Sequence, residues 1–289
     1  MRGYIAITVL ITAIMIFDAP AYGKIAIMVS IAPQKYFVQQ ICKELADVQV
    51  MVPPATSPAT YEPKPRQMAA LSKTRIYFSI GVPFEMAWLK KIAAANPNMA
   101  VVPTDSGIKK RPMAAHRHRG EGTQPDHGTL DPHVWLSPAL VRIQALTILT
   151  AVLEADPGKR SVYENNYRTF ISQLSDLDNE LRNTFDGRQG LQFMVFHPSW
   201  GYFADTYGLK QVPIEIEGKD PKPAQLKELI EHAKARGIKF IFVQPQFSDR
   251  SAKLIAREIG GQVIYADPMA EDWAENLQAV ASKIRTALK

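Results

Sequence analysis

The chain has 289 residues, of which 46% are hydrophobic and 21% charged, with a single cysteine and a formal net charge of +6. This is enough chain for one large or two ordinary domains, and the apolar content is too high for a mainly disordered protein. Cys42 has no partner for an intramolecular disulfide and cannot alone supply the thiolates of a zinc ribbon or an iron–sulfur cluster. Any metal site must therefore be built from histidine and carboxylate side chains.

The N-terminus has the pattern of a secretory signal peptide. Arg2 gives a short positive start, residues 3–17 are uncharged and apolar, and Ala21 and Gly23 place small residues before a potential cleavage site. The apolar run is shorter than the roughly 20 residues that a membrane-spanning helix needs, which argues against a retained anchor. We therefore expect residues 1–23 to be removed on export. One basic and one acidic residue would be lost with them, so the net charge of +6 would remain.

Short apolar runs alternate with helical patterns along the rest of the chain. Strands are expected at 25–31, 48–52, 76–80, 99–102, 193–196, 212–216, 240–243 and 263–265. Helices are expected at 83–95, 223–236, 248–259 and 273–288. Buried strands that alternate with helices are typical of parallel sheets built from βα units.

One long helix is predicted between the two series of strands. After the start signal Asp156-Pro157, apolar residues recur at steps of three and four. They are Tyr163, Tyr167, Phe170, Leu174, Leu177, Leu181 and Phe185. About 25 residues at 1.5 Å per residue would span roughly 38 Å, the width of a domain. The simplest architecture is two α/β lobes joined by this helix.

The stretch 104–129 breaks the alternation. It contains Gly, Pro, Arg and His without a sustained apolar period, so we expect a surface loop there. The one dense group of basic residues lies within it, at 109–119, while the other basic residues are dispersed. No aromatic–basic recognition motif accompanies them, so we expect no nucleic acid partner.

Three side chains at strand ends or loop starts are candidate metal ligands. His197 follows the strand at 193–196, Asp267 follows the strand at 263–265, and His133 lies in the segment LDPHVWLSP. Open α/β sheets place ligand groups at the carboxyl ends of their strands. Neutral imidazole and carboxylate suit Zn²⁺ and Mn²⁺. Capping or turn residues would give the same pattern, and the spacing alone leaves both interpretations open.

Five segments carry a resemblance to a known family. They are VSIAP at 29–33, PPATSPATYEP at 53–63, LDPHVWLSP at 130–138, FMVFHPSWG at 193–201 and FVQPQF at 242–247. In this order they resemble the periplasmic substrate-binding proteins of zinc and manganese ABC importers, and most closely the zinc-uptake type. The resemblance covers essentially all of the chain after residue 23.

This resemblance implies an α/β fold of two similar parallel-sheet lobes, bridged by one long rigid helix, with a metal cleft between the lobes. The implied segments are a signal peptide at 1–23, an N-terminal lobe at 24–155 with its surface loop at 104–129, a connecting helix at 156–186 and a C-terminal lobe at 187–289. By motif, His133 matches the second metal ligand of the family, His197 the third, and Asp267 the carboxylate of the C-terminal lobe.

The first ligand of the family has no counterpart here. Relatives usually carry a histidine in a segment of the form Pro-Pro-Gly-x-x-Pro-His-x-Tyr-Glu-Pro, where this chain has Ala59, which has no donor atom. Water or Glu62 could complete the site, or a histidine from the nearby loop. Relatives often have a loop rich in His and acidic residues there, whereas residues 109–127 contain three histidines and five basic residues, which repel a cation. Metal scavenging and a merely solvated basic loop both remain open for it.

We therefore expect a monomeric periplasmic protein that captures a divalent metal ion and delivers it to the membrane permease of an ABC importer. The expected cargo is Zn²⁺, with Mn²⁺ as the second choice, and no bond is made or broken. Two histidines and one aspartate can also hold a catalytic zinc, so a zinc-dependent hydrolase is one alternative, although the chain has no His-Glu-x-x-His segment. A chelate-binding protein or an adhesin on the same scaffold is the other.

Overall fold

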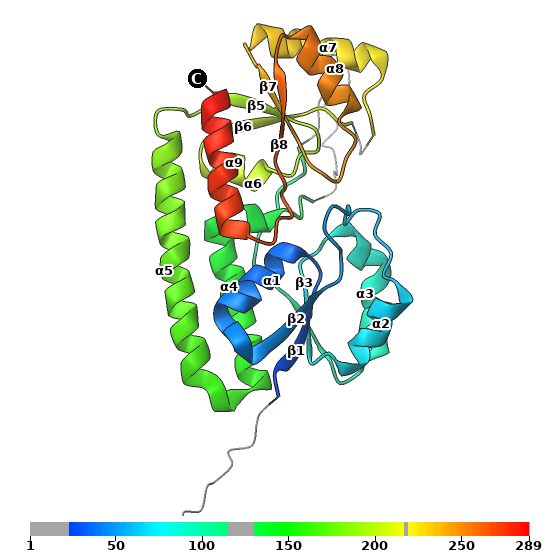
Figure 1. The fold of residues 1–289 in the computed structure, drawn as a ribbon, viewed down its shortest axis with the longest axis vertical. Coiled ribbons are helices and arrows are strands. Elements are labelled where there is room, and N and C mark those ends of the chain that lie inside the picture. The colour runs from blue at the N-terminus through cyan, green and yellow to red at the C-terminus, as the bar shows by residue number, and fades with distance from the viewer. Residues whose placement is uncertain (1–22, 115–129, 217–218, 289) are drawn as a thin grey trace, which may run out of the picture.

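The computed structural model describes residues 23–114, 130–216 and 219–288, and within these ranges the strands form two parallel four-stranded sheets (Figure 1). The first sheet has the order β2-β1-β3-β4, with β1 (Ile25–Val29), β2 (Ala46–Val50), β3 (Ile76–Ser79) and β4 (Ala100–Pro103). The second has the order β6-β5-β7-β8, with β5 (Gln192–Val195), β6 (Lys210–Pro213), β7 (Phe240–Val243) and β8 (Gln262–Tyr265). The two sheets share one topology, which confirms the predicted pair of similar parallel-sheet lobes.

The helices lie where the chain crosses between strands. They are α1 (Ala32–Cys42), α2 (Pro65–Ala70), α3 (Pro83–Ala95), α4 (Pro138–Ala155), α5 (Arg160–Phe185), α6 (Gly201–Thr206), α7 (Pro223–Ala235), α8 (Arg250–Glu258) and α9 (Trp273–Ala287). Helices α2, α3, α4 and α7 begin with proline, whose missing N–H costs nothing at the first helical position. The helices predicted from periodicity correspond to α3, α7, α8 and α9, with ends that differ by at most two residues.

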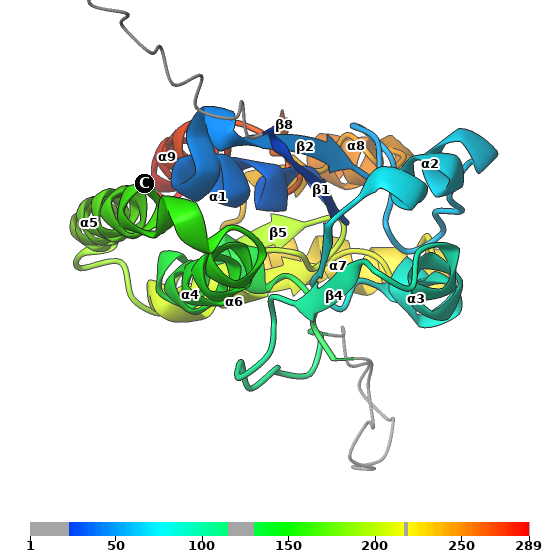
Figure 2. The same cartoon turned by 90° about the horizontal axis from the view of Figure 1, so that it is seen from below.

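The predicted connecting helix is α5, which runs beside both lobes (Figures 1 and 2). Its 26 residues correspond to a length of about 39 Å. The buried side chains are Tyr163, Phe170, Leu174, Leu177, Leu181 and Phe185, all from the stripe that the sequence periodicity predicts. Burial of one face along its whole length therefore explains why this mostly polar segment is helical.

Helix α4 is a second long helix, which periodicity does not predict. Its buried residues include Val141 and Ile148, while Ile143 and Leu146 on the other side are exposed, so the apolar residues form no single stripe. Among the described residues it is the one helix long and apolar enough to cross a membrane. It packs along α5, however, as expected for a core helix.

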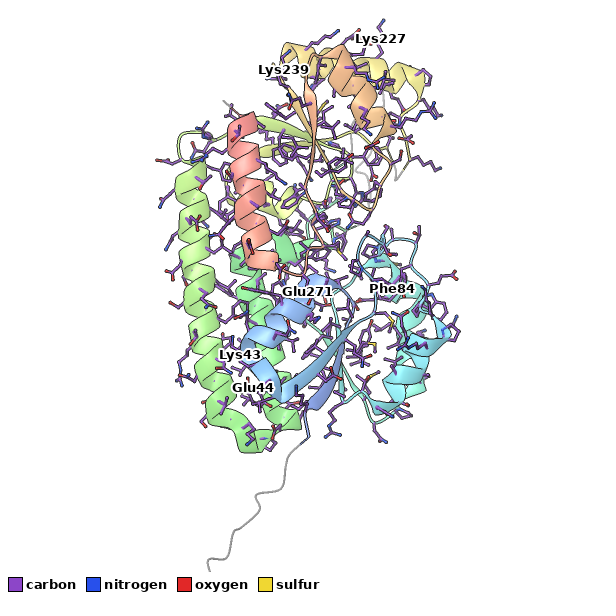
Figure 3. The ribbon with its side chains drawn as sticks, in the orientation of Figure 1. Lys43, Glu44, Phe84, Lys227, Lys239 and Glu271 are labelled. Atoms are coloured by element: carbon purple, nitrogen blue, oxygen red, sulfur yellow. The ribbon has the colours of Figure 1, made fainter. Side chains whose placement is uncertain are left out.

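Helix α9 follows the second sheet in sequence but packs against α5 and the helix α1 of the first lobe. The Trp273 ring lies 5.1 Å from that of Phe37 in an edge-to-face arrangement. Next to it, Lys35 Nζ is 2.6 Å from the carboxylate of Glu271, a residue that lies where the lobes meet (Figure 3). The C-terminal helix thus joins the two lobes a second time.

One apolar core runs through both lobes. It contains Phe78 of the first sheet, Phe170 of α5, Phe193 of the second sheet and Phe203 of α6, all essentially inaccessible to solvent. A second, smaller core lies between the opposite face of the second sheet and helices α7 and α8. Because close-packed rings have little freedom to slide, the shared core fixes how one lobe sits on the other.

The contact between α5 and α1 can be tested by removing the ring of Phe170, which is 1% exposed and lies 6.2 Å from that of Phe37. We expect Phe170→Ala to lower the free energy of unfolding by about 3–5 kcal/mol, because the ring leaves a cavity. Urea denaturation measures this change. Val162→Ala, at a position of α5 that is 43% exposed, is the matched control. A loss as small as that of the control would contradict the packing described.

Candidate metal centre

A pocket lies between the lobes at the carboxyl ends of the parallel strands. Its lining residues include Ser57, Pro58 and Ala59 after β2, Val82 and Pro83 after β3, His133 and Trp135 before α4, His197 after β5, Gln246 and Phe247 after β7, and Pro268 and Met269 after β8. Parallel strands end at the same edge of a sheet, so each lobe presents its loops to the other there. The pocket is therefore formed by segments that are far apart in the sequence.

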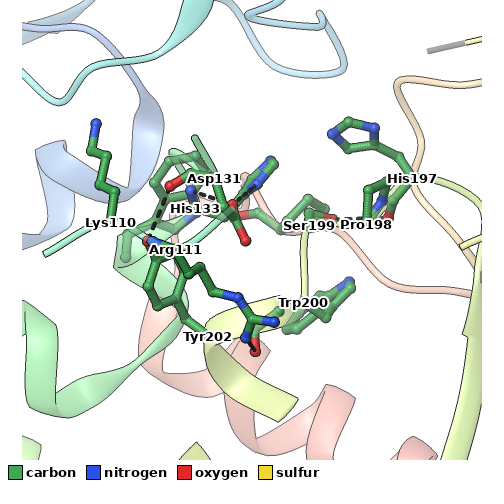
Figure 4. Close-up of polar contacts among 12 residues, drawn as sticks. Lys110, Arg111, Asp131, His133, His197, Pro198, Ser199, Trp200 and Tyr202 are labelled. Carbon is green, nitrogen blue, oxygen red and sulfur yellow. Dashed lines mark hydrogen bonds and ion pairs between the residues drawn. The ribbon is translucent and has the colours of Figure 1, made fainter. Parts of the chain in front are cut away.

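The structure brings two of the predicted site residues together. The ring centroids of His133 and His197 are 5.3 Å apart, with an angle of 67° between the ring planes. Figure 4 shows the two side chains approaching from different loops. Trp135 lies 5.1 Å from the His133 ring, and Phe247 stacks on His197 at 4.8 Å. Aromatic walls thus enclose the imidazoles on the sides that do not face each other.

A buried carboxylate supports each imidazole. His133 Nδ1 is 2.7 Å from Asp131 Oδ1, and His197 Nδ1 is 2.7 Å from Glu215 Oε1. An ionised carboxylate can only accept a hydrogen bond, so each Nδ1 carries the proton. In the neutral rings this leaves the Nε2 lone pair available to a metal ion, as in carboxylate–histidine–zinc arrangements.

The environment of His133 favours the neutral ring. The residue is 8% exposed, and burial lowers its pKa, outweighing the nearby Asp131 carboxylate, which raises it. Asp131 is itself fully buried, and within the described part of the chain its Oδ2 has no hydrogen-bond partner. Because metal ions compete with protons for imidazole nitrogen, a neutral His133 is ready to bind a cation at neutral pH.

Hydrogen bonds across the lobes hold the segment that carries Asp131 and His133 (Figure 4). The backbone N–H of Arg111 donates to Tyr202 Oη at 3.0 Å, and this hydroxyl donates to the carbonyl of Asp131 at 3.1 Å. The N–H of Asp131 donates to the carbonyl of Arg111 at 2.8 Å. A Cβ at Gly201 would lie 2.8 Å from Asp131 Oδ2, so α6 approaches this carboxylate so closely that a larger residue would require one of the two to shift.

The backbone of His197 is clamped by Gln244, a fully buried residue at the end of β7. The N–H of His197 donates to Gln244 Oε1 at 3.2 Å, and Gln244 Nε2 donates to the carbonyl of His197 at 2.6 Å. The loop after β5 is thereby fixed to the neighbouring strand, which holds the imidazole at the pocket.

Asp267 lies beside the pocket but does not line it. Its Oδ1 accepts hydrogen bonds from Gln246 Nε2 at 2.8 Å and from the N–H of Met269 at 2.9 Å. The next residue is tied to the segment of His133, because the indole N–H of Trp135 donates to the carbonyl of Pro268 at 2.7 Å. In the described part of the chain, no three His, Cys, Asp or Glu residues are grouped to hold one ion. The role of Asp267 as a ligand therefore remains a prediction.

Ala59 lines the pocket, at the position where the sequence lacks an expected histidine. Its loop is anchored by the carbonyl of Pro58, which accepts the N–H of Phe84 at 3.1 Å, and Phe84 is drawn in Figure 3. Glu62, one candidate replacement, is exposed and is not among the lining residues. The other candidates, His116, His118 and His127, lie outside the described residues.

Comparison with known proteins decides the family. The family described as the periplasmic zinc-uptake complex component A (ZnuA) matches residues 27–287. The chain belongs to this family. Its members are substrate-binding proteins for zinc uptake, not enzymes. This confirms the predicted resemblance and excludes the hydrolase alternative.

Relatives and solved structures agree with this assignment. The chain is 29% identical to the high-affinity zinc uptake system protein ZnuA of Bacillus subtilis, over 83% of this chain and 76% of that protein. It is 28% identical to the zinc-binding lipoprotein AdcA of Streptococcus pneumoniae over 93% of its own length, but spans only 56% of AdcA. A crystal structure of ZnuA superposes with a TM-score of 0.86 and 44% identity, over 92% of this chain and all of that one.

Sequence reasoning assigns no role to four polar residues at the site: Gln246, which lines the pocket, and Asp131, Glu215 and Gln244, which hold the two histidines. Asp131 stands two residues before His133, so its proximity could be inferred from the motif. Glu215 could be inferred from topology, since β5 and β6 are paired in parallel and their following residues must be neighbours. Both glutamines lie in the segment FVQPQF at 242–247, which carries the family resemblance, but nothing in the sequence assigns either of them a role.

The close approach at Gly201 predicts the effect of a single methyl group. We expect Gly201→Ala to lower the free energy of unfolding by about 1–3 kcal/mol, because the new Cβ would meet the buried Asp131 carboxylate. Thermal or urea unfolding measures the change. Gly158→Ala is the control, since a Cβ there meets nothing closer than 3.7 Å. Equal stability of the two variants would show that Asp131 can move aside freely.

Proposed function

We propose that this protein captures Zn²⁺ in the periplasm and delivers it to the permease of an ABC importer. The observation that carries the proposal is the pair of imidazoles in the pocket between the lobes, each with its Nδ1 bonded to a buried carboxylate. Such a pair presents two neutral nitrogen ligands whose orientation is set before the ion arrives. Membership of the zinc-uptake family supports zinc as the cargo.

The proposed ligands are His133, His197 and Asp267. Two imidazoles favour Zn²⁺ over Mn²⁺, which prefers carboxylate, carbonyl and water oxygen. Asp267 comes from the loop after β8 and is held next to the pocket by Gln246 and Met269. In this proposal its second carboxylate oxygen reaches the ion while the first keeps its two hydrogen bonds. The division into lobes at 24–155 and 187–289, with 156–186 between them, is part of the same proposal.

Export and partnership complete the proposal. The apolar segment at 3–17 and the small residues that end at Gly23 support cleavage near residue 23 and release into the periplasm. The mature monomer would then meet the permease with its metal bound. A chelate-binding protein or an adhesin on the same scaffold is the competing function. A bound chelate would add an absorbing organic ligand to the purified protein, whereas a bare ion would not.

The two histidines should control zinc binding. We expect saturable one-to-one binding of Zn²⁺ to the metal-free mature protein, and a loss of at least about tenfold in affinity for His133→Ala and for His197→Ala. Isothermal calorimetry measures both. His232→Ala, on α7 and away from the pocket, is the control and should bind as the wild type does. Variants at His133 and His197 that bind zinc normally would refute the assignment.

The pH dependence follows from the lowered pKa of His133. Because this pKa lies below the usual 6.5, the ring stays neutral at pH 7 and takes up a proton only under acidic conditions. We therefore expect zinc affinity to change little between pH 8 and pH 7 through this residue, and to fall on the acid side of pH 6.5. Calorimetry across this range tests the sign. Affinity that rises on acidification would contradict a site made of imidazoles.

A further inference from the structure

Gln246 lines the same pocket as the two histidines and is hydrogen-bonded to Asp267. It follows β7, is half-buried, and lines the same pocket as His133, His197 and Ala59. It lies in the family segment FVQPQF at 242–247, but the resemblance implies no ligand role for it. What it can do in the pocket depends on which way its amide faces.

The hydrogen bonds fix the orientation of this amide. Gln246 Nε2 lies 2.8 Å from Asp267 Oδ1, which also accepts the N–H of Met269. An ionised carboxylate has no proton to donate, so the NH₂ end of the amide must face Asp267. Oε1 is therefore the acceptor left over. It is buried and has no hydrogen-bond partner among the residues that the structure describes.

The histidines in the same pocket cannot satisfy this oxygen. Both Nδ1 protons are given to Asp131 and Glu215, so each neutral ring offers an Nε2 lone pair and no further N–H donor. Two imidazole acceptors and the residue that carries this amide acceptor thus line one pocket. Buried acceptors require a donor or a cation, and one cation can satisfy all three.

We propose that Gln246 Oε1 is a ligand of the captured cation and takes the place left by Ala59. With His133, His197 and Asp267 it completes the four ligands that a tetrahedral zinc site requires. The hydrogen bond to Asp267 polarises the amide and increases the negative charge on Oε1, which makes it a better ligand. This inference rests on the proposed function, since it adds one ligand to the same site.

Zinc affinity of the mature protein, measured by competition with a chromophoric chelator, tests the proposal. We expect Gln246→Leu to weaken binding by at least about tenfold. Gln246→Glu keeps an oxygen at the position and should bind more tightly than the Leu variant. Gln262→Leu, at an exposed glutamine on β8 of the same lobe, is the matched control and should leave the affinity unchanged.

Repeating the measurement in the Asp267→Ala variant distinguishes a ligand role of Gln246 from a role in positioning Asp267. If Gln246 acted only by holding Asp267, then Gln246→Leu would have no effect in a protein that already carries Asp267→Ala. We expect a further loss in that background, and a shift of the visible bands of the Co²⁺-loaded protein when Gln246 alone is changed to Leu. An unchanged affinity or an unchanged cobalt spectrum would overturn the proposal.

If the Leu variant does not fold, the Gln246→Glu variant provides the test. Zinc binding by Gln246→Glu that is weaker than zinc binding by Asp267→Ala would refute an oxygen ligand at this position. A wild-type protein that does not bind zinc would instead refute the proposed function itself.

Discussion

The pocket depends on one constraint, the apolar core that continues from one sheet to the other along α5. Near the middle of this helix Phe170 packs against Phe37 of the first lobe, and at its C-terminal end Phe185 meets Phe203 of α6 at 5.6 Å. The two histidines belong to separate loops, and no local interaction in the sequence could set their distance. Their ring separation of 5.3 Å is therefore a result of packing some distance away from the rings themselves. The apolar core thus sets the separation of the two candidate ligands.

Burial of polar groups near the pocket has a desolvation penalty, which the packing of the apolar core offsets. Asp131 Oδ2, Glu215 Oε2 and Gln246 Oε1 are buried acceptors that find no hydrogen-bond partner in the ranges 23–114, 130–216 and 219–288. Each would prefer water, and each keeps its place because surrounding side chains exclude water and fix the backbone. These acceptors lie close to the pocket of a protein whose net charge is +6. At short range the acceptor oxygens, and not the net charge, would attract a cation.

Much of the fold could be predicted from the sequence, because the β-branched runs and the stripe along α5 encode burial directly. Helix α4 could not, since its apolar residues surround it and only tertiary packing selects the buried side. At the site, His133 and His197 were accessible to motif comparison. The partners of these side chains were harder to predict from motifs. Glu215 reaches His197 because β5 and β6 are paired, and Gln246 meets Asp267 because β7 and β8 end side by side. Contacts between strand ends require the sheet order, which the sequence does not state.

The single cysteine has a consequence for life outside the cytoplasm. Cys42 ends α1 inside the shared core, and burial together with nearby Asp156 raises its pKa to about 12. The thiolate is the form that reacts with oxidants and disulfides, so the folded protein keeps its sulfur inert. In an oxidising compartment this prevents disulfide-linked dimers between copies of the chain. The thiol becomes reactive only when α1 leaves the core, so the reaction of Cys42 with a thiol reagent would report unfolding of this region.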